Sequence, residues 1–483
     1  MQQQINRITD ILRRDDWISW AMHYTEQISW ILFLKFIDDY EKENQQWAIL
    51  NGEDYQFIID RQYQRDSRAC PKTPDGKLDI NNALTWDDLK NFVDEKLFPY
   101  LKSFKDISKE YSTMKYKIWE IFYFIDNRIE SWHTLREILD IVDQLSFQNE
   151  DDLFQLSKIY EELLQWMWSD GGNAGEFYTP RPVIKTMVET IQPRIHQTVY
   201  DGATWSCWFL IEAFEKLKQQ EKTTYDHDFL RYHTFYWNEK TPIAYIMGMM
   251  NMILHGIENP NISKQNSLTQ DVRSIEEKDK YDIILANPPF GGKEKEQIQA
   301  NFPIKTNATE MLFLQHFMKK LKIWWKAAII VPEWVLFNTS HPFQKIKKEL
   351  IENYNLHTIC SLPAGVFLPY SGVKTNIIYF NKEWSTKNIW YYEVDPGRNL
   401  TKNSPLKYEE LQDFVNLFGT WKETQNSRIV SVEDIKDYDL SAKNPNKTNQ
   451  EQYRPPEEIL EDIFAKDQKI NSSLQKIREN LKS

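Results

Sequence analysis

The chain has 483 residues, of which 41% are hydrophobic and 27% charged, and its net charge is −12. It is long enough for two or three domains, and no run of eighteen apolar residues suggests a membrane-spanning helix. The polar N-terminus and three widely spaced cysteines predict a cytoplasmic protein without a disulfide framework or a metal site. Because the net charge is negative, we do not expect this chain to bind DNA phosphates without a partner.

Residues 1–165 are expected to form a mainly helical N-terminal domain. Residues 24–37 are apolar nearly all round, which is typical of a buried helix. Amphipathic segments at 135–145 and 152–164 continue the helical pattern.

Residues 166–400 predict an α/β domain. Short apolar runs of strand type occur at 198–200, 281–286, 327–331, 358–362, 375–380 and 389–394. Helical stretches such as 209–218 and 311–321 lie between them, and this alternation favours a doubly wound, mostly parallel sheet. The last two runs are too close for a helical crossover, so we expect them to form an antiparallel pair at one edge.

After residue 400 the chain becomes polar, and residues 401–450 are expected to be an extension or linker. Residues 451–483 then predict a C-terminal helix with apolar residues at a/d spacing, broken by Asp467. This helix could pack on its own domain or contact a partner subunit.

The tetrapeptide Asn287-Pro288-Pro289-Phe290 directly follows the apolar run 281–286. Ligands of doubly wound sheets bind beyond the carboxyl ends of the strands, where this segment should lie. The Asn287 side-chain oxygen and the Pro288 carbonyl can accept both hydrogens of a planar amine, and Phe290 offers a stacking face for a flipped base. Prolines stiffen such a turn and remove competing N–H donors. We therefore predict a binding site for an exocyclic NH₂ group.

Several motifs resemble a known family. Residues 171–183 read Gly-Gly-Asn-Ala-Gly-Glu-Phe-Tyr-Thr-Pro-Arg-Pro-Val, and similar family segments stand at 248–252 and 362–367. Together with the Asn-Pro-Pro-Phe segment, they resemble the modification subunit of type I restriction–modification systems. The resemblance implies a Rossmann-like fold that transfers methyl from S-adenosylmethionine to the N6 amine of a flipped adenine in double-stranded DNA. It also implies a separate specificity subunit, a second copy of this chain, and a restriction subunit as a further partner.

The resemblance also assigns residues. The catalytic segment is Asn287, Pro288, Pro289 and Phe290. The cofactor-binding residues are Tyr178, Thr179, Pro180, Asp201, Ala203, Trp205, Ser206, Trp208, Glu239 and Asn266. Segment 178–180 would border the methionine end of the cofactor, Asp201 would contact its amino group, and Glu239 its ribose hydroxyls. A helix-capping role for Glu239 stays open, as does the role of Asn266 at the adenine ring.

The cofactor loop departs from the family pattern. The chain has only 14 glycines, about 3% where about 7% is usual, but 18 tryptophans. Trp205 and Trp208 occupy glycine positions of the loop, and two indoles there would fill the cofactor pocket. Further tryptophans stand in glycine-like contexts at 237, 324, 325, 334 and 384. We hypothesise that a codon read as glycine in the source cell was translated as tryptophan; the alternative is a tryptophan-rich paralogue.

Two other functions stay open from the sequence. A protein-glutamine N-methyltransferase would use the same segment, because that segment can hold any planar NH₂ group. If Trp205 and Trp208 are genuine, the chain could instead be a scaffold subunit that binds no cofactor.

Overall fold

The computed structural model describes residues 2–15, 21–75, 77–84, 87–107, 113–145, 157, 160, 179–257, 260–368 and 371–441. The predicted helix 451–483, the segment 171–178 and all but two residues of the predicted helix 152–164 lie outside these ranges. Within the described residues, no helix combines the length and the apolar character needed to cross a membrane.

The N-terminal part is helical, as the sequence predicts. Its helices are α1 (Gln2–Leu12), α2 (Ala21–Asn51), α3 (Arg65–Arg68), α4 (Asp87–Asn91), a π-helical turn (Phe92–Leu97), α5 (Phe98–Lys102), α6 (Phe104–Ile107), α7 (Met114–Phe124) and α8 (Trp132–Val142). Side-chain oxygens cap two of them: Thr113 accepts from the Tyr116 amide at the start of α7, and Ser131 accepts from Thr134 at the start of α8. Helix α2 contains the predicted segment 24–37, most of which is buried.

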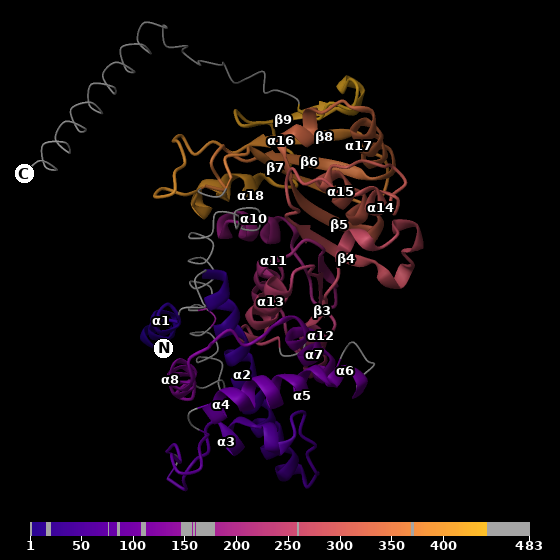
Figure 1. The fold of residues 1–483 in the computed structure, drawn as a ribbon. Helices are drawn as coiled ribbons and strands as arrows, with labels where there is room; N and C mark the ends of the chain where they lie inside the picture. The colour runs from indigo at the N-terminus through magenta and orange to yellow at the C-terminus, as the bar shows by residue number, and fades with distance from the viewer. Residues whose placement is uncertain are drawn as a thin grey trace, which may run out of the picture. The chain divides into compact units, whose positions relative to one another are not determined.

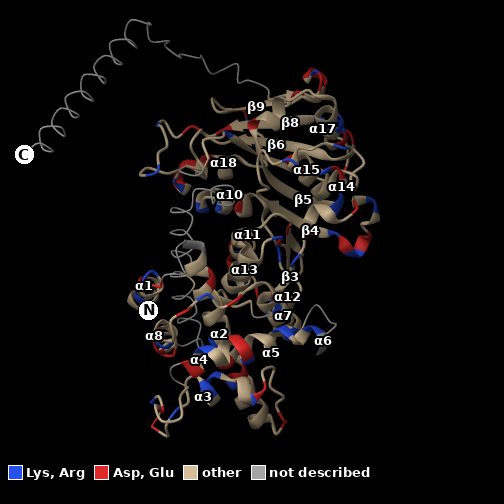
Figure 2. Ribbon diagram, viewed as in Figure 1, with Lys and Arg blue, Asp and Glu red and all other residues tan. Residues whose placement is uncertain are grey.

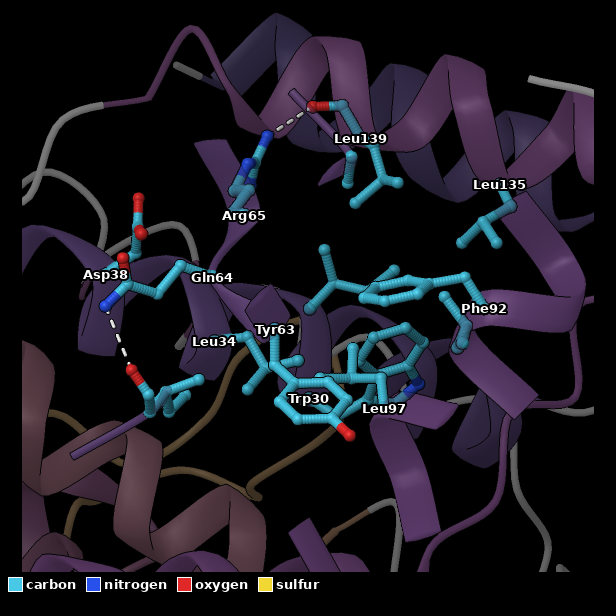
Figure 3. A pocket seen from close by; sticks show the side chains of 14 residues that line it. Trp30, Leu34, Asp38, Tyr63, Gln64, Arg65, Phe92, Leu97, Leu135 and Leu139 are labelled. Atoms are coloured by element: carbon cyan, nitrogen blue, oxygen red, sulfur yellow. Dashed lines mark hydrogen bonds between the residues drawn. The ribbon is translucent and has the colours of Figure 1, made fainter. Parts of the chain in front are cut away.

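A cavity of about 60 Å³ lies within this helical core (Figure 3). Its walls are mainly apolar and include Trp30, Phe92 and Leu135. At one end the Arg65 guanidinium donates to the Leu139 carbonyl at 2.6 Å. A space this small holds little more than a few water molecules, so we treat it as a packing gap of the helical core.

The α/β part is built on one nine-stranded sheet with the order β3-β2-β1-β4-β5-β7-β6-β8-β9. Its strands are β1 (Val199–Asp201), β2 (Phe235–Asn238), β3 (Asn261–Ser263), β4 (Tyr281–Ala286), β5 (Leu321–Pro332), β6 (Asn355–Ser361), β7 (Thr375–Asn381), β8 (Asn388–Glu393) and β9 (Ser427–Ser431). Strands β3, β2, β1, β4 and β5 are parallel. The chain order reverses between β1 and β4, and a switch point of this kind is where doubly wound sheets bind ligands.

Helices cover both faces of the sheet (Figure 1). They are α10 (Arg181–Ile191), α11 (Trp208–Lys218), α12 (Thr224–Tyr232), α13 (Pro242–Leu254), α14 (Glu296–Gln299), α15 (Thr309–Lys320), α16 (Glu333–Phe337), α17 (His341–Asn353) and α18 (Gln412–Leu417). Side chains of α10, α11 and α13 share one apolar core with one face, and those of α15 and α17 share a second core with the other. Alternate residues of β4 divide between these cores, as the two-residue period of a strand requires: Ile283 joins the first and Ile284 the second.

The expected doubly wound class is confirmed, but the expected pairing of the runs 375–380 and 389–394 is wrong. Strand β7 lies antiparallel between β5 and β6, whereas β8 lies beyond β6 and runs parallel to it. The connection at 382–387 spans one intervening strand, a distance of about 10 Å that six extended residues easily cover. The antiparallel edge is made instead by β9, which pairs with β8. The sheet therefore continues past residue 400, where we expected only a polar extension.

The N-terminal helices pack directly against the α/β part. Helix α13 contacts α2 and α7, and the first apolar core runs continuously through all three helices. The Tyr245 hydroxyl donates to Glu120 at 2.6 Å, and Lys117 Nζ donates to the Pro260 carbonyl at 2.6 Å. Burial lowers the pKa of Lys117 to about 7.

Candidate functional site

A cavity of about 310 Å³ opens at the switch point, beyond the carboxyl ends of β1, β2 and β4. Glycine and alanine of the loop after β1 form one wall, and Glu239 and Asn266 lie on the segments after β2 and β3. Asn287, Pro289 and Phe290 form the wall that follows β4. With Thr309 and Phe313 of α15, the cavity therefore gathers residues from five separate chain segments.

The Asn287 amide is held with one end bonded and the other free. Its Nδ2 donates to the Thr179 Oγ1 at 2.9 Å, and Thr179 is only 7% exposed. Its Oδ1 is buried and accepts no hydrogen bond from the described residues. A buried acceptor without a donor is unfavourable by about 1–3 kcal/mol, so this atom is suited to a ligand N–H group.

Phe290 presents an aromatic wall next to this amide. It is partly buried and meets Phe367 edge-on, with ring centroids 6.0 Å apart and planes at 85°. Pro288 is buried behind the turn, while Pro289 reaches the cavity. A planar heterocycle could therefore stack its face on the Phe290 ring while its edge donates a hydrogen bond to Asn287 Oδ1.

The loop after β1 is fixed by Asp201. This buried carboxylate accepts from the Ala203 amide at 3.0 Å, and burial raises its pKa to about 7. Thr204 Oγ1 accepts from the Cys207 amide at 3.0 Å, and Cys207 has a left-handed φ of 63° at the start of α11. These bonds turn Gly202, Ala203 and Thr204 toward the cavity.

The expectation that two indoles would fill the pocket is wrong. Trp205 and Trp208 are absent from the cavity lining, as is Ser206, whose carbonyl accepts from Asn251 on α13. The Trp208 ring lies under the Arg181 guanidinium, whose Cζ is 3.8 Å from the ring centroid. The Trp205 side chain belongs to the apolar core behind the loop. Neither indole therefore occupies the cavity.

Glu239 is the cavity's buried acid; Glu294 also lines the cavity. Its Oε1 accepts from both the amide and the hydroxyl of Thr241, each at 2.7 Å, and burial raises its pKa to about 7. Asn266 uses its side-chain oxygen to cap the 3₁₀ turn at Ser267–Thr269 through the Leu268 amide. Both side chains line the cavity as well, so capping and ligand contact are compatible there.

The structure places the other predicted residues around this cavity. Thr179 and Pro180 stand at the start of α10, where Pro180 is the N-cap residue; Tyr178 lies outside the described residues. Asn238 and Ser267 also line the cavity, although neither was among the predicted site residues. Asn238 donates to the Tyr200 hydroxyl, and Ser267 donates to the Gly202 carbonyl at 2.6 Å. Each is the chain neighbour of a predicted site residue, Glu239 or Asn266, and this adjacency is the signal that could have indicated it.

A doubly wound sheet with an Asn-Pro-Pro-Phe turn and an acid-lined cavity at its switch point defines an amino-group methyltransferase. The family model for N-6 DNA Methylase matches residues 149–454, and that for the HsdM N-terminal domain matches residues 1–142. The Type I restriction enzyme EcoEI methylase subunit of Escherichia coli is 35% identical over 91% of this chain and 89% of its own. The EcoKI methylase subunit of Escherichia coli K12 is 28% identical over 73% of this chain and 70% of its own.

Solved structures agree with these sequence matches. A chain from a study of type I R-M complex assembly superposes with a TM-score of 0.80 and 36% identity, over 99% of this chain and 98% of that one. A modification subunit from Vibrio vulnificus YJ016 gives a TM-score of 0.81 and 34% identity over 92% and 97%. The chain belongs to the N-6 DNA methylase family, and within it to the modification subunits of type I restriction–modification systems. It is an adenine-N6 DNA methyltransferase.

Proposed function

We propose that this chain binds S-adenosylmethionine in the switch-point cavity and methylates an adenine that is flipped out of double-stranded DNA. The observation that carries the proposal is the buried Asn287 Oδ1, which has no partner among the described residues and lies in the same cavity as the acid Glu239. One end of the cavity thus suits an amine and the other suits a nucleoside.

Asn287 and Phe290 would hold the base. Asn287 Oδ1 and the Pro288 carbonyl accept the two hydrogens of the exocyclic amine, which turns the nitrogen lone pair out of the base plane. Phe290 stacks on the ring and offsets part of the stacking lost when the base leaves the duplex. Thr179 fixes the plane of the Asn287 amide through the bond to Nδ2.

S-adenosylmethionine supplies a methyl group on a positively charged sulfur. The residues present fit this group, because the cavity offers a carboxylate, side-chain amides and a narrow glycine–alanine wall. Glu239 would accept the ribose hydroxyls, Asn266 would face the adenine ring, and segment 178–180 would border the methionine end. Asp201 and Ala203 would shape the loop, together with the backbone at Trp205, Ser206 and Trp208.

The chain's contribution to the rate is positioning and electrostatics. Bound S-adenosylmethionine would supply its methyl group to the N6 nitrogen and would leave as a neutral thioether, while the amine would lose one proton to solvent. Two acceptor oxygens on the amine hydrogens stabilise the positive charge that develops on the nitrogen.

We propose that a separate specificity subunit reads the DNA sequence and that a second copy of this chain and a restriction subunit join the complex. The net charge of −12 supports this proposal, because binding to DNA phosphates needs cationic side chains, which another subunit would then supply. In the view of Figure 2 the basic and acidic residues of the described chain are interspersed along the ribbon. The described part is thus better suited to catalysis than to gripping DNA alone.

The test is an Asn287→Ala variant in the complex with its specificity subunit. We expect methyl transfer to DNA to fall by about 10²–10³-fold, as when one preorganised polar contact to developing charge is lost. Calorimetric binding of S-adenosylmethionine should change little, because the cofactor end of the cavity is intact. Asn353→Ala, at an exposed residue at the end of α17, serves as the control. Transfer to DNA that is unaffected by Asn287→Ala would refute the proposal.

A further inference from the structure

Two exposed tryptophans have a backbone conformation that favours glycine. Trp324 has a φ of 72° and Trp421 a φ of 49°, both in the left-handed region. A side chain with a Cβ is disfavoured there, and an aromatic residue gains nothing in return unless it is packed. These two are 63% and 47% exposed, so little apolar burial offsets the strain.

Tryptophans that are integral to the fold look different. Trp30 is 2% exposed and donates its indole N–H to Gln27 at 2.8 Å; Trp390 is 1% exposed and donates to the Lys422 carbonyl at 3.1 Å. Trp390 also stacks on Phe414 with ring centroids 5.8 Å apart. Both have ordinary backbone angles, since neither is among the residues with positive φ. The two groups therefore differ in both φ and exposure.

Trp237 on β2 fits its surroundings poorly for a different reason. The ring is buried, but its Nε1 has no hydrogen-bond acceptor among the described residues. It lies 3.7 Å from the position that a Cβ on Gly248 would take, so this part of α13 packs beside the unsatisfied donor. A buried N–H without a partner is unfavourable, and a smaller residue at 237 would remove it.

An interaction surface is the competing explanation for exposed indoles. Trp324 and Trp384 do contact each other edge-on, with ring centroids 5.9 Å apart; Trp324 lies in the first part of β5 and Trp384 follows β7. A docking surface accounts for their exposure but not for the left-handed φ of Trp324, which is a property of the backbone. It also leaves the separate case of Trp421 unexplained.

We infer that the natural protein carries glycine at positions 324 and 421, and that the same reassigned codon, UGA read as glycine, places glycine at 205, 208 and 237. Positions 30 and 390 are tryptophan in the natural protein. The inference stands independently of the proposed methyl transfer, because it rests on backbone angles and indole environments far from the cavity as well as near it. At 205 and 208 it would give the cofactor loop the small residues that a close backbone approach favours.

The deciding experiment is peptide mass spectrometry of the protein purified from its source cells, read beside the gene sequence. We expect glycine and a UGA codon at 324 and 421, and tryptophan and UGG at 30 and 390, which serve as internal controls. Tryptophan at 324 or 421 would overturn the inference.

A recombinant series gives a second, physical readout. Trp324→Gly and Trp421→Gly should raise the melting temperature of the chain, because each relieves a left-handed φ and exposes little that was buried. Trp30→Gly and Trp390→Gly should lower it strongly, since each opens a cavity in the core and removes the hydrogen bond of a buried indole. A loss of stability in the first pair as large as in the second would contradict the reasoning.

Discussion

Replacing Glu239 by glutamine should weaken the binding of S-adenosylmethionine and raise the stability of the ligand-free chain. Burial raises the pKa of Glu239 from 4.5 to about 7, so the ionised carboxylate is disfavoured in the folded chain without ligand. Such a group contributes stability below its ordinary pKa and loses that contribution as the pH rises through about 7. The full loss corresponds to about 3 kcal/mol at pH 8, since one pKa unit is worth about 1.4 kcal/mol.

Glutamine keeps the oxygen that accepts from the Thr241 amide and hydroxyl, but it cannot ionise. We therefore expect Glu239→Gln to stabilise the ligand-free chain by up to about 3 kcal/mol at pH 8 and by less than about 1 kcal/mol near pH 5. The affinity for S-adenosylmethionine should fall by about 10- to 100-fold at pH 8, because hydrogen bonds to a charged acceptor are worth about 1.5–3 kcal/mol. Wild-type affinity should rise with pH through about 7, and that of the variant should stay flat.

The assay is thermal melting at several pH values, paired with calorimetric titration of the cofactor. Glu276→Gln is the control, because that carboxylate is 66% exposed and lies outside the cavity lining. A variant that binds the cofactor normally, or that is less stable than wild type at pH 8, would refute this role for Glu239.

Three further variants test the base end and the loop. Phe290→Ala should reduce methylation of DNA by about 10- to 100-fold at unchanged cofactor affinity, since stacking is worth about 1–3 kcal/mol per base; Phe290→Tyr should retain most activity. Thr179→Val should lower kcat by about three- to tenfold while Thr179→Ser restores it, because only the hydroxyl accepts from Asn287; equal kinetics of both variants would contradict this. Gly202→Ala should lower the free energy of unfolding by about 1–3 kcal/mol in a melting experiment, since its Cβ would lie 2.7 Å from Tyr200 Oη; an unchanged melting temperature would count against it.

The sequence was sufficient for the elements that recur with a clear period. The apolar run 281–286 became β4, the helical stretch 209–218 became α11, and Asn287 came to the end of a central strand, as expected. These predictions succeeded because the hydrophobic period of a buried strand or a helix face is contained in the segment itself and does not depend on distant contacts.

Strand partners and side-chain directions were harder to predict. Strands β2 and β3 have only four and three residues, too few for a period to appear, and β9 lies in a polar stretch. The partner of β7 depends on contacts far along the chain, so closeness in sequence pointed to the wrong neighbour. The Trp208 ring packs against Arg181 of α10, and a contact with another helix cannot be predicted from the loop sequence alone.

The most direct test of the central claim is to locate the transferred methyl group. The complex purified from the source cells would be incubated with DNA and S-adenosylmethionine labelled on its methyl, and the products separated into nucleosides and protein digests. We predict label on the N6 nitrogen of adenine, and about 10²–10³-fold slower labelling when the complex carries Asn287→Ala. Label on a protein glutamine, or unlabelled adenine despite bound cofactor, would contradict it.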